Sequence, residues 1–393
     1  VPNLRFPEFQ GEWKKCKLSE ICTFFSGGTP SSSNKDFYGG NIAFIRSGEL
    51  HADSTELFIT QAGFDSSSAK MVEVGDLLLA MYGATSGDIA VSKIKGAINQ
   101  AILCIRTKQN KKFIESVWNK HVSKNLRKYL QGGQGNLSAD IVKGISFFFP
   151  TSKEQEKIAN LVSLLDERIA TQNKIIDKLQ SLIKGLEDNL LDNPLWKKTY
   201  LRSFMQFFPT NSLSWEQLSY KEGAIRNLHY GLIHSFQTRG INSASLPMIK
   251  NEAIPKQYTL CQVGDVAFAD ASEDTGEIAK SVEFVDTIEG DTICGLHTIH
   301  GRDIKNRTVV GFKGFAFNSR YFHHQIKRLA QGTKVFSITA NNLSSCYVYL
   351  PDLETQKAIV KLLKAYETQL IVSRKTLKQY EKQKQYLLRQ MFI

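Results

Sequence analysis

The sequence repeats itself, so a fold that suits its first half must also suit its second half. The segment VGDLLLAMYGATSGDIA from Val74 and the segment VGDVAFADASEDTGEIA from Val263 share Val-Gly-Asp, a later Gly and Ile-Ala at a constant shift of 189. A second match, at a shift of 201, joins Pro150 to Pro351, Gln155 to Gln356, Ile158 to Ile359 and Leu161 to Leu362. We expect Trp13 and Trp215, at a shift of 202, to open the two copies. Two copies of one module therefore follow each other along the chain.

Each copy ends in a segment that has the features of one long helix. Residues 152–191 and 352–393 contain no proline, are rich in Leu, Lys, Glu and Gln, and follow a proline that suits a helix start. Positions spaced alternately by four and three form a mostly apolar seam, as in a coiled coil. The seam positions are Ile158, Val162, Leu165, Ile169, Gln172, Ile176, Leu179, Ile183, Leu186 and Leu190 and, in the second copy, Ile359, Leu363, Tyr366, Leu370, Ser373, Leu377, Tyr380, Lys384, Leu387 and Met391.

The matching seams predict that the two helices pair as an antiparallel coiled coil. At 1.5 Å per residue each seam is roughly 50 Å long, which is somewhat more than one ~34 Å turn of DNA. Because single buried polar residues fix the register of coiled coils, we expect Gln172 and Ser373 to face each other. The alternative is that each helix packs only on its own domain, although this would not require a seam along the full length.

Before each helix, the sequence alternates short apolar stretches with Gly, Ser and Asn, as in IAFIR, DLLLAMY, AILCIRT, DVAFAD and YVYLP. This pattern is typical of mixed α+β domains. The predicted fold is α+β, with two similar domains separated by two long antiparallel helices that form a coiled-coil spacer and give the chain a pseudo-two-fold repeat. The predicted parts are a first domain at 1–150, a helix at 151–192, a second domain at 193–350 and a helix at 351–393.

Composition limits the partner and the location. The 50 Lys and Arg residues outnumber the 38 Asp and Glu residues, and the net charge of +12 favours a polyanionic partner. No apolar run approaches the roughly 20 residues that span a bilayer, and the opening VPNLRFPEFQGEWKK is too polar for a signal peptide, so we expect a cytoplasmic location. The six cysteines include no CxxC pair and are expected to be buried thiols rather than metal ligands or members of disulfides.

The loops between the apolar stretches carry residues suited to DNA contact. Gly lets the backbone approach a phosphate, Ser, Thr and Lys bind its oxygens, and Arg, Asn, Gln and His can read base edges. Any one of them also fits an ordinary solvated turn, and only their recurrence in both copies favours a DNA interface. The candidates are Thr29, Ser31, Ser32, Lys35, Arg46, Tyr82, Thr85, Gln131, Gln134 and Asn136 in the first copy, and Arg226, Asn227, His229, Tyr230, His234, Arg239, His297, Gln331 and Lys334 in the second.

Catalytic and cofactor motifs are missing from the sequence. The nearest match to the Asn/Asp-Pro-Pro-aromatic motif of amino-methyltransferases is Asn193-Pro194-Leu195-Trp196, which lacks the second Pro and suits the end of a helix. The sequence contains no GxxxxGK[ST] phosphate loop and no HExxH metal motif. Asp352 and Glu354 stand where a carboxylate would cap a helix. We therefore predict a non-catalytic chain with no cofactor or metal of its own.

With these features together, the chain resembles the specificity subunits of Type I restriction-modification systems. The similar segments in the first copy are LRFPEFQGEWKKCKLSEI, SGGTPS with a following Tyr-Gly-Gly, VGDLLLAMYGATSG, INQAI from Ile98 and the Pro-x-x-x-Glu-Gln-x-x-Ile-Ala helix start at Pro150. In the second copy they are LHYGLIHS, GDVAFADASED and GLHTI. The second helix start, PDLETQKAIV, departs from the pattern because Thr355 separates Glu354 from Gln356.

The resemblance implies a concrete function. Each domain would be a target-recognition domain that reads one half of a split, asymmetric sequence in double-stranded DNA, and the helices would set the gap between the halves. The helices would also dock two methyltransferase subunits that carry S-adenosylmethionine and methylate adenine, and restriction subunits that use ATP and Mg²⁺ would join them. Two alternatives remain at this point: an orphan DNA-binding adaptor without enzyme partners, and a coiled-coil scaffold that binds protein.

Overall fold

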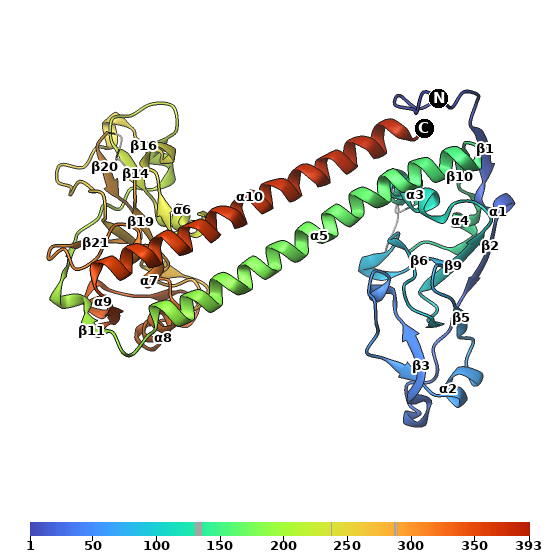
Figure 1. Ribbon diagram of the computed structural model, residues 1–393, viewed down its shortest axis with the longest axis horizontal. Helices are drawn as coiled ribbons and strands as arrows, with labels where there is room; N and C mark the ends of the chain where they lie inside the picture. The colour runs from blue at the N-terminus through green and yellow to red at the C-terminus, as the bar shows by residue number, and fades with distance from the viewer. Residues whose placement is uncertain (130–135, 237, 287, 289) are drawn as a thin grey trace. The chain divides into compact units, whose positions relative to one another are not determined.

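The computed structural model describes residues 1–393 except residues 130–135, 237, 287 and 289. The chain forms two compact units, one made of Val1–Gln172 with Thr376–Ile393 and the other of Asn173–Lys375. Two long helices, α5 (Ser152–Leu191) and α10 (Leu353–Met391), each contribute one part to either unit (Figure 1). The first unit is therefore completed by the end of the chain rather than by one continuous stretch.

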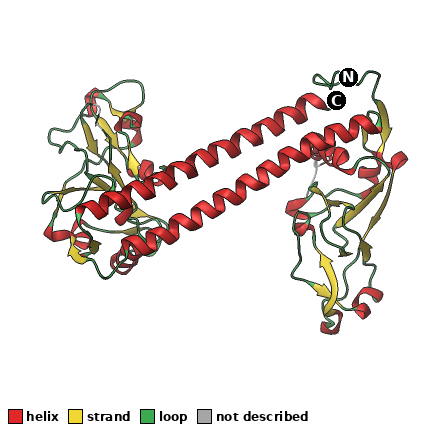
Figure 2. Ribbon diagram, viewed as in Figure 1, coloured by secondary structure: helices red, strands yellow, loops and turns green. Residues whose placement is uncertain are grey.

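Two four-stranded sheets form most of the first unit, with helices around them (Figure 2). Their strand orders are β2-β9-β6-β7 and β4-β3-β8-β5, and β1 and β10 form a separate pair. The strands are β1 (Lys14–Lys17), β2 (Cys22–Ser26), β3 (Tyr38–Ile45), β4 (Phe58–Ile59), β5 (Lys70–Val72), β6 (Leu77–Ala80), β7 (Ile89–Val91), β8 (Gly96–Ile98), β9 (Ile102–Thr107) and β10 (Ser146–Phe149). The helices before α5 are α1 (Leu18–Ile21), α2 (Gln61–Asp65), α3 (Lys111–Tyr129) and α4 (Ala139–Gly144).

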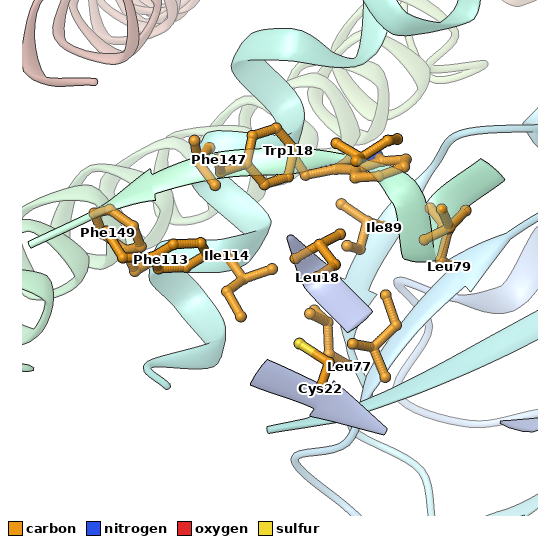
Figure 3. Packing of buried hydrophobic residues seen from close by; sticks show 14 of the residues in the cluster. Leu18, Cys22, Leu77, Leu79, Ile89, Phe113, Ile114, Trp118, Phe147 and Phe149 are labelled. Carbon is orange, nitrogen blue, oxygen red and sulfur yellow. The ribbon is translucent and has the colours of Figure 1, made fainter. Parts of the chain in front are cut away.

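The main core of the first unit lies between its first sheet, α3 and the long helices. Phe113 and Trp118 of α3 are fully buried there, and Figure 3 shows them beside Phe147 and Phe149 of β10. The Trp118 indole Nε1 donates to the carbonyl of Gly87 at 2.8 Å, so its polar atom is also satisfied. The last residues of the chain belong to the same core, because the rings of Phe392 and Phe113 lie 5.2 Å apart.

The second unit has a larger sheet of order β12-β21-β17-β19-β15 and a four-stranded sheet of order β13-β16-β14-β20, with the pairs β11-β23 and β18-β22. The strands are β11 (Lys197–Tyr200), β12 (Met205–Phe208), β13 (Leu218–Ser219), β14 (Arg226–Leu228), β15 (Gly240–Ile241), β16 (Met248–Ile249), β17 (Val266–Ala269), β18 (Ala271–Ser272), β19 (Ser281–Phe284), β20 (Thr292–Cys294), β21 (Thr298–Asp303), β22 (Phe336–Ser337) and β23 (Tyr347–Leu350). The helices are α6 (Tyr230–Ser235), α7 (Phe312–Ala316), α8 (Arg320–Leu329) and α9 (Ala340–Ser345). Both units are thus mixed α+β domains, as predicted.

Strand registers confirm the internal repeat. The antiparallel pair β1-β10 places Lys14 opposite Phe149, and the pair β11-β23 places Lys197 opposite Leu350. β1 corresponds to β11 at a shift of 183, and β10 corresponds to β23 at a shift of 201. The second copy therefore gains residues at more than one place along its length.

The register corrects one correspondence. Because Lys14 matches Lys197, the residue before it, Trp13, matches Trp196. The prediction that Trp215 opens the second copy is therefore wrong. Residue type alone suggested it, whereas Trp215 lies on a short 3-10 turn with its ring 4.5 Å from that of His229.

The repeated Val-Gly-Asp forms the same turn in both copies. Gly75 and Gly264 both have φ near +91°, in the left-handed region that favours glycine. The aspartate that follows is buried, accepts a hydrogen bond from the backbone of the turn and binds an arginine of the neighbouring strand. The ion pairs are Asp76 with Arg106 and Asp265 with Arg302, each 2.7 Å long. The charge-assisted hydrogen bonds between this aspartate and the arginine therefore explain why Val-Gly-Asp recurs in the sequence.

The predicted seams form the covered face of the long helices. None of the seam positions is exposed, whereas neighbouring apolar residues such as Leu164, Leu182 and Val372 are. In the first unit the start of α5 lies beside the end of α10, with Asp166 and Lys384 2.5 Å apart. In the second unit the end of α5 and the start of α10 share the side chain of Arg239. The helices are therefore antiparallel within each unit.

The pairing of the two polar seam positions, Gln172 and Ser373, stays a prediction. Ser373 is buried and Gln172 is half-buried, as expected for a polar layer in a seam. Their mutual pairing stays a hypothesis about the register of the coiled coil.

Buried glutamines join each long helix to the domain that precedes it. The side-chain amide of Gln155 donates to the carbonyl of Pro150 at 2.9 Å, while its oxygen accepts from the backbone of Asn110. Gln356 makes the equivalent bonds to Pro351 and to the backbone of Val309, both at 3.0 Å. The glutamine found by comparing the two copies is thus a structural anchor.

The helix ends agree with the sequence interpretation. Asp352 caps α10, because its carboxylate accepts from the backbone of Thr355 at 2.8 Å. Asn193 follows the end of α5 and accepts from the backbone of Leu195 at 3.0 Å, which makes it a turn residue. The prediction of helix termination rather than a methyltransferase motif at Asn193 is confirmed.

Five of the six cysteines are buried, as predicted, whereas Cys16 is partly exposed at the edge strand β1. All six are free thiols. As for membranes, neither the long helices nor any other helix in the described part of the chain has the length and hydropathy of a membrane span.

Replacing Phe392 by Ala should destabilise the first unit. The side chain is 2% exposed and packs on Phe113, so its removal leaves a cavity worth about 3–5 kcal/mol. Leu164→Ala on the exposed face of α5 is the control and should change the free energy of unfolding by less than about 0.5 kcal/mol. Denaturant unfolding measures both. Equal effects would show that the chain end contributes nothing to this core.

Candidate nucleic-acid interface

In the first unit, the ends of β3, β8 and β6 meet at one edge. The backbone of Asn99, just after β8, donates to the carbonyl of Ile45 at the end of β3 (3.4 Å). The backbone of Met81, just after β6, donates to Ala101 (2.8 Å) and accepts from Leu137 (2.8 Å). We call the residues that follow these strand ends, together with their hydrogen-bonded neighbours, the first edge: Thr29, Arg46, Tyr82, Thr85, Asn99, Gln100 and Asn136.

The second unit has an edge at the equivalent place. The backbone of Gly295, just after β20, donates to the carbonyl of Leu228 at the end of β14 (2.9 Å). The backbone of Asp270, just after β17, donates to His297 (3.1 Å) and accepts from Ile338 (2.9 Å). We call the corresponding residues the second edge: Tyr230, Asp270, His297, Gln331 and Lys334, the last two in the loop before β22.

The two edges share a backbone frame but differ in side chains. Leu137 and Ile338 correspond at the shift of 201, and each donates to the residue that follows the central strand of its sheet. On this frame both edges carry a tyrosine and an amide, but the first adds aliphatic hydroxyl and guanidinium groups, whereas the second adds imidazole, carboxylate and ammonium groups. Equivalent places with unlike chemistry are suited to reading unlike ligands.

The structure brings several predicted residues of the first copy together. Thr29, Arg46, Tyr82 and Asn136 are exposed at the first edge, and the Thr29 hydroxyl binds the amide oxygen of Gln100. Ser31, Ser32 and Lys35 are exposed on the adjoining loop, and Thr85 is half-buried in the turn after Tyr82. Gln131 and Gln134 lie outside the described residues.

Arg46 is already paired within its loop. Its guanidinium contacts Glu49 at 2.7 Å while its side chain stays 50% exposed. A phosphate or base would therefore compete with Glu49 for this guanidinium. The Glu49 contact pre-orients the arginine for such an exchange.

In the second copy, His297 has the most constrained geometry of the edge. Its backbone is left-handed, with φ at 55°, and its Nδ1 lies 3.0 Å from the carboxylate of Asp270. The ring of Tyr230 meets it edge-on at 5.3 Å. Since the side chain is 49% exposed, the imidazole is both held in place and available. Gln331 and Lys334 are exposed in the loop between α8 and β22.

Three predicted contacts are corrected. Asn227 is fully buried and binds the side chain of Asn211 at 2.8 Å, and His229 is 3% exposed and caps α6 through the backbone of Gly231. Burial, followed by the nearby His297, lowers the pKa of His229, so it stays neutral in the interior. Neither side chain can reach DNA from these positions. They hold the loop in shape instead.

Arg239 is the third correction. Its guanidinium lies 2.7 Å from Glu187 of α5 and 3.3 Å from Glu367 of α10, so it docks the domain on the helices. The two remaining predictions are partly engaged: Arg226 donates to the carbonyl of Ala244 at 3.0 Å, and His234 lies 3.2 Å from Glu277. These two stay candidates with structural partners.

The sequence interpretation missed Asn99, Gln100 and Asp270. Asn99 and Gln100 lie in the INQAI segment, which resembles the family. Their place at the first edge depends on the pairing of β3 with β8, which the sequence alone does not show. Asp270 gave no signal of its own, because an isolated aspartate after a strand is common in turns.

The carboxylates where the long helices meet have their pKa values shifted in opposite directions in the two units. In the first unit, burial tends to raise the pKa of Asp166, but Lys112 and Lys384 outweigh it and the net pKa is lowered. In the second unit, burial dominates and raises the pKa of Glu187 to about 7 despite Arg239. The pKa of Glu367, which occupies the place of Asp166 at the shift of 201, is raised by burial too.

Among the residues that the structure describes, one group has the geometry to hold a metal ion: Cys261, Cys294 and His300, all buried. The edges themselves offer hydrogen-bond donors and acceptors. Their chemistry is that of recognition.

A family model for the Type I restriction modification DNA specificity domain matches residues 10–181 and 296–382, which is more than half of the chain. The chain belongs to this family. It is a Type I restriction-modification specificity subunit, and its fold is the duplicated α+β arrangement with long helices described above.

Relatives match along nearly the full length of this specificity subunit. A putative Type I restriction enzyme MjaX specificity subunit from Methanocaldococcus jannaschii is 25% identical and covers 97% of this chain and 93% of that protein. The MjaVIII specificity subunit of the same organism is 22% identical over 98% of this chain and 92% of the relative. The crystal structure of a Type I restriction-modification S subunit from M. genitalium superposes with a TM-score of 0.65 at 15% identity, covering 100% of this chain and 99% of that chain.

Glu187→Gln should make stability less dependent on pH. The pKa of Glu187 is raised from 4.5 to about 7 on folding, so its contribution is present below about pH 4.5 and is lost as the pH rises through about 7. As the pH rises from about 5 to about 8, the unsubstituted chain should lose about 1–3 kcal/mol of unfolding free energy that the variant keeps. Denaturant unfolding at both pH values tests this, with the exposed Glu252→Gln as control. Parallel pH profiles for the three chains would contradict the assignment.

Proposed function

We propose that this specificity subunit reads a bipartite, asymmetric sequence in double-stranded DNA, one half with each edge. The observation that carries the proposal is that the two edges occupy equivalent places in two copies of one domain and carry unlike side chains. A shared frame sets how each domain approaches DNA, while unlike donors and acceptors select unlike bases. The target should therefore not be an inverted repeat.

The charge of the chain supports a DNA partner. The net charge of +12 favours a polyanion, and the exposed Lys35 and Lys334 lie on loops that adjoin the two edges. Lysine and hydroxyl contacts to phosphates would position the domains, and the edge residues would supply specificity. The other site residues predicted from sequence, except Asn227, His229 and Arg239, stay candidates for these contacts.

The long helices would set the unread gap and dock the enzyme subunits. Their seams hold α5 and α10 antiparallel within each unit, and in this proposal the paired helices act as the spacer between the two half-sites. In this proposal two methyltransferase subunits bring S-adenosylmethionine and methylate adenine, and restriction subunits bring ATP and Mg²⁺. The specificity subunit itself is non-catalytic and works in the cytoplasm. A similar solved chain, with a TM-score of 0.56 at 14% identity, comes from a study of the assembly of a Type I restriction-modification system.

Sequencing modified bases tests the proposal directly. The subunit is co-expressed with a Type I methyltransferase subunit from the same genome, and the host DNA is sequenced for modified adenine. We expect one split motif with two unlike halves and a fixed gap. A stable complex with the methyltransferase that leaves adenine unmodified would point instead to an adaptor or a scaffold.

His297→Gly should relax only one half of the motif. Glycine removes the imidazole and tolerates the positive φ, so the loss reports on recognition rather than on backbone strain. One base-edge contact is worth about 1–3 kcal/mol, so discrimination at one position of that half should fall about ten- to a hundredfold.

Asn306→Gly is the matched control for His297→Gly. Asn306 also has positive φ, at 51°, but it follows the opposite end of β21. The same modified-base sequencing reads both variants. Changes in both halves, or equal changes from the two variants, would count against a base contact by His297.

A further inference from the structure

Three side chains with metal-ligand chemistry converge inside the second unit from separate segments. Cys261 precedes the turn into β17, Cys294 ends β20 and His300 lies in β21. Their exposed fractions are 7%, 3% and 1%, and one possible ligand atom from each lies within 4.8 Å of the others. Buried thiols and an imidazole at this spacing form a candidate cation site.

The distances fit a tetrahedral zinc-type ion. The two sulfurs are 3.6 Å apart. Zinc–sulfur bonds of about 2.3 Å in a tetrahedron place two sulfurs about 3.8 Å from each other, so an ion could enter with small side-chain movements. Two thiolates would also balance the charge of a divalent cation in the buried site.

His300 has a carboxylate partner, as metal-binding histidines commonly do. Its Nε2 lies 2.7 Å from the carboxylate of Asp265, which leaves Nδ1 with the lone pair that a cation needs. Arg302 binds the same carboxylate at 2.7 Å and holds it in place.

The first copy serves as an internal comparison. Its hydrogen-bonded registers place Val72, Ile98 and Cys104 at the positions of Cys261, Cys294 and His300, since Val72 faces Gly96 as Cys261 faces Thr292, and Leu78 faces Cys104 as Ala267 faces His300. In the first copy these three residues are fully buried members of one hydrophobic core. Two aliphatic core positions, Val72 and Ile98, thus become cysteines in the second copy, and the third changes from Cys104 to His300.

A fourth buried position also carries a polar side chain in the second copy only. Thr292 replaces Gly96, lies on the same strand face as Cys294 two residues away, and is 1% exposed. Its hydroxyl has no hydrogen-bond partner among the described residues. Such a hydroxyl can hold a water molecule at the open coordination position of a cation. Cys294 also lines a surface cavity of 370 Å³, which offers an entry path.

We propose that the second domain binds one zinc-type divalent cation through the thiolates of Cys261 and Cys294 and the imidazole of His300. Binding forms two metal–sulfur bonds and one metal–nitrogen bond and releases the two thiol protons to solvent. The cation ties the start of β17 to β20 and β21, next to the loop that carries His297. This inference does not depend on DNA recognition, because its readout is metal binding by the chain alone.

Cobalt titration of the reduced, full-length chain tests the site. Cobalt(II) bound by thiolates shows sulfur-to-metal charge-transfer absorption, and we expect one equivalent to bind and to be displaced by zinc. Cys261→Val and Cys294→Ile introduce the residues that pack at these positions in the first copy, and each should abolish the absorption. His300→Gln should weaken cobalt binding at least tenfold.

Cys346→Ala is the matched control, because Cys346 is a buried thiol of the same unit outside the group. It should leave cobalt binding unchanged, and circular dichroism confirms that each variant is folded. No charge-transfer band in the unsubstituted chain, or a band that survives Cys294→Ile, overturns the proposal. So does a chain that binds no cobalt but forms a Cys261–Cys294 disulfide on oxidation.

Discussion

Burial of the two apolar seams is the constraint on which the rest of the structure depends. Most of the stability of a helix in a protein comes from packing its apolar face, so α5 and α10 each need a partner. Because the partners run antiparallel within each unit, the end of the chain returns to the first domain, where Phe392 completes the core. The first unit is therefore discontinuous in sequence, and neither copy folds as a self-contained half.

The domains are fastened to these helices by polar contacts at equivalent places. Gln155 and Gln356 bind the carbonyl before each helix and the loop of the preceding domain. Further along, the first unit places lysines against Asp166, and the second places Arg239 against Glu187 and Glu367. One corresponding position, Asp166 in the first copy and Glu367 in the second, thus has its pKa shifted in opposite directions, because burial is outweighed at Asp166 and dominates at Glu367.

A common backbone frame lets the two edges diverge while the fold is kept. The Val-Gly-Asp turns, with their Asp–Arg pairs, keep the central strands aligned in both copies. The loops at the strand ends are bound to that frame through backbone hydrogen bonds, which do not depend on side-chain identity. Side chains at the edges can therefore change without loss of the fold. The buried Cys261, Cys294 and His300 show that the divergence extends into one core.

The sequence by itself determined the repeat, the long helices with their seams, the cap at Asp352, the helix end before Asn193, and the family. These features are local or periodic, so they can be recognised from spacing and residue type. Only the tertiary structure decided that Trp196 rather than Trp215 matches Trp13, that Arg239 docks on helices, and that Asn227 and His229 are buried. It also brought Cys261, Cys294 and His300 together. Each of these depends on strand register between segments far apart in sequence, and composition carries no information about such pairing.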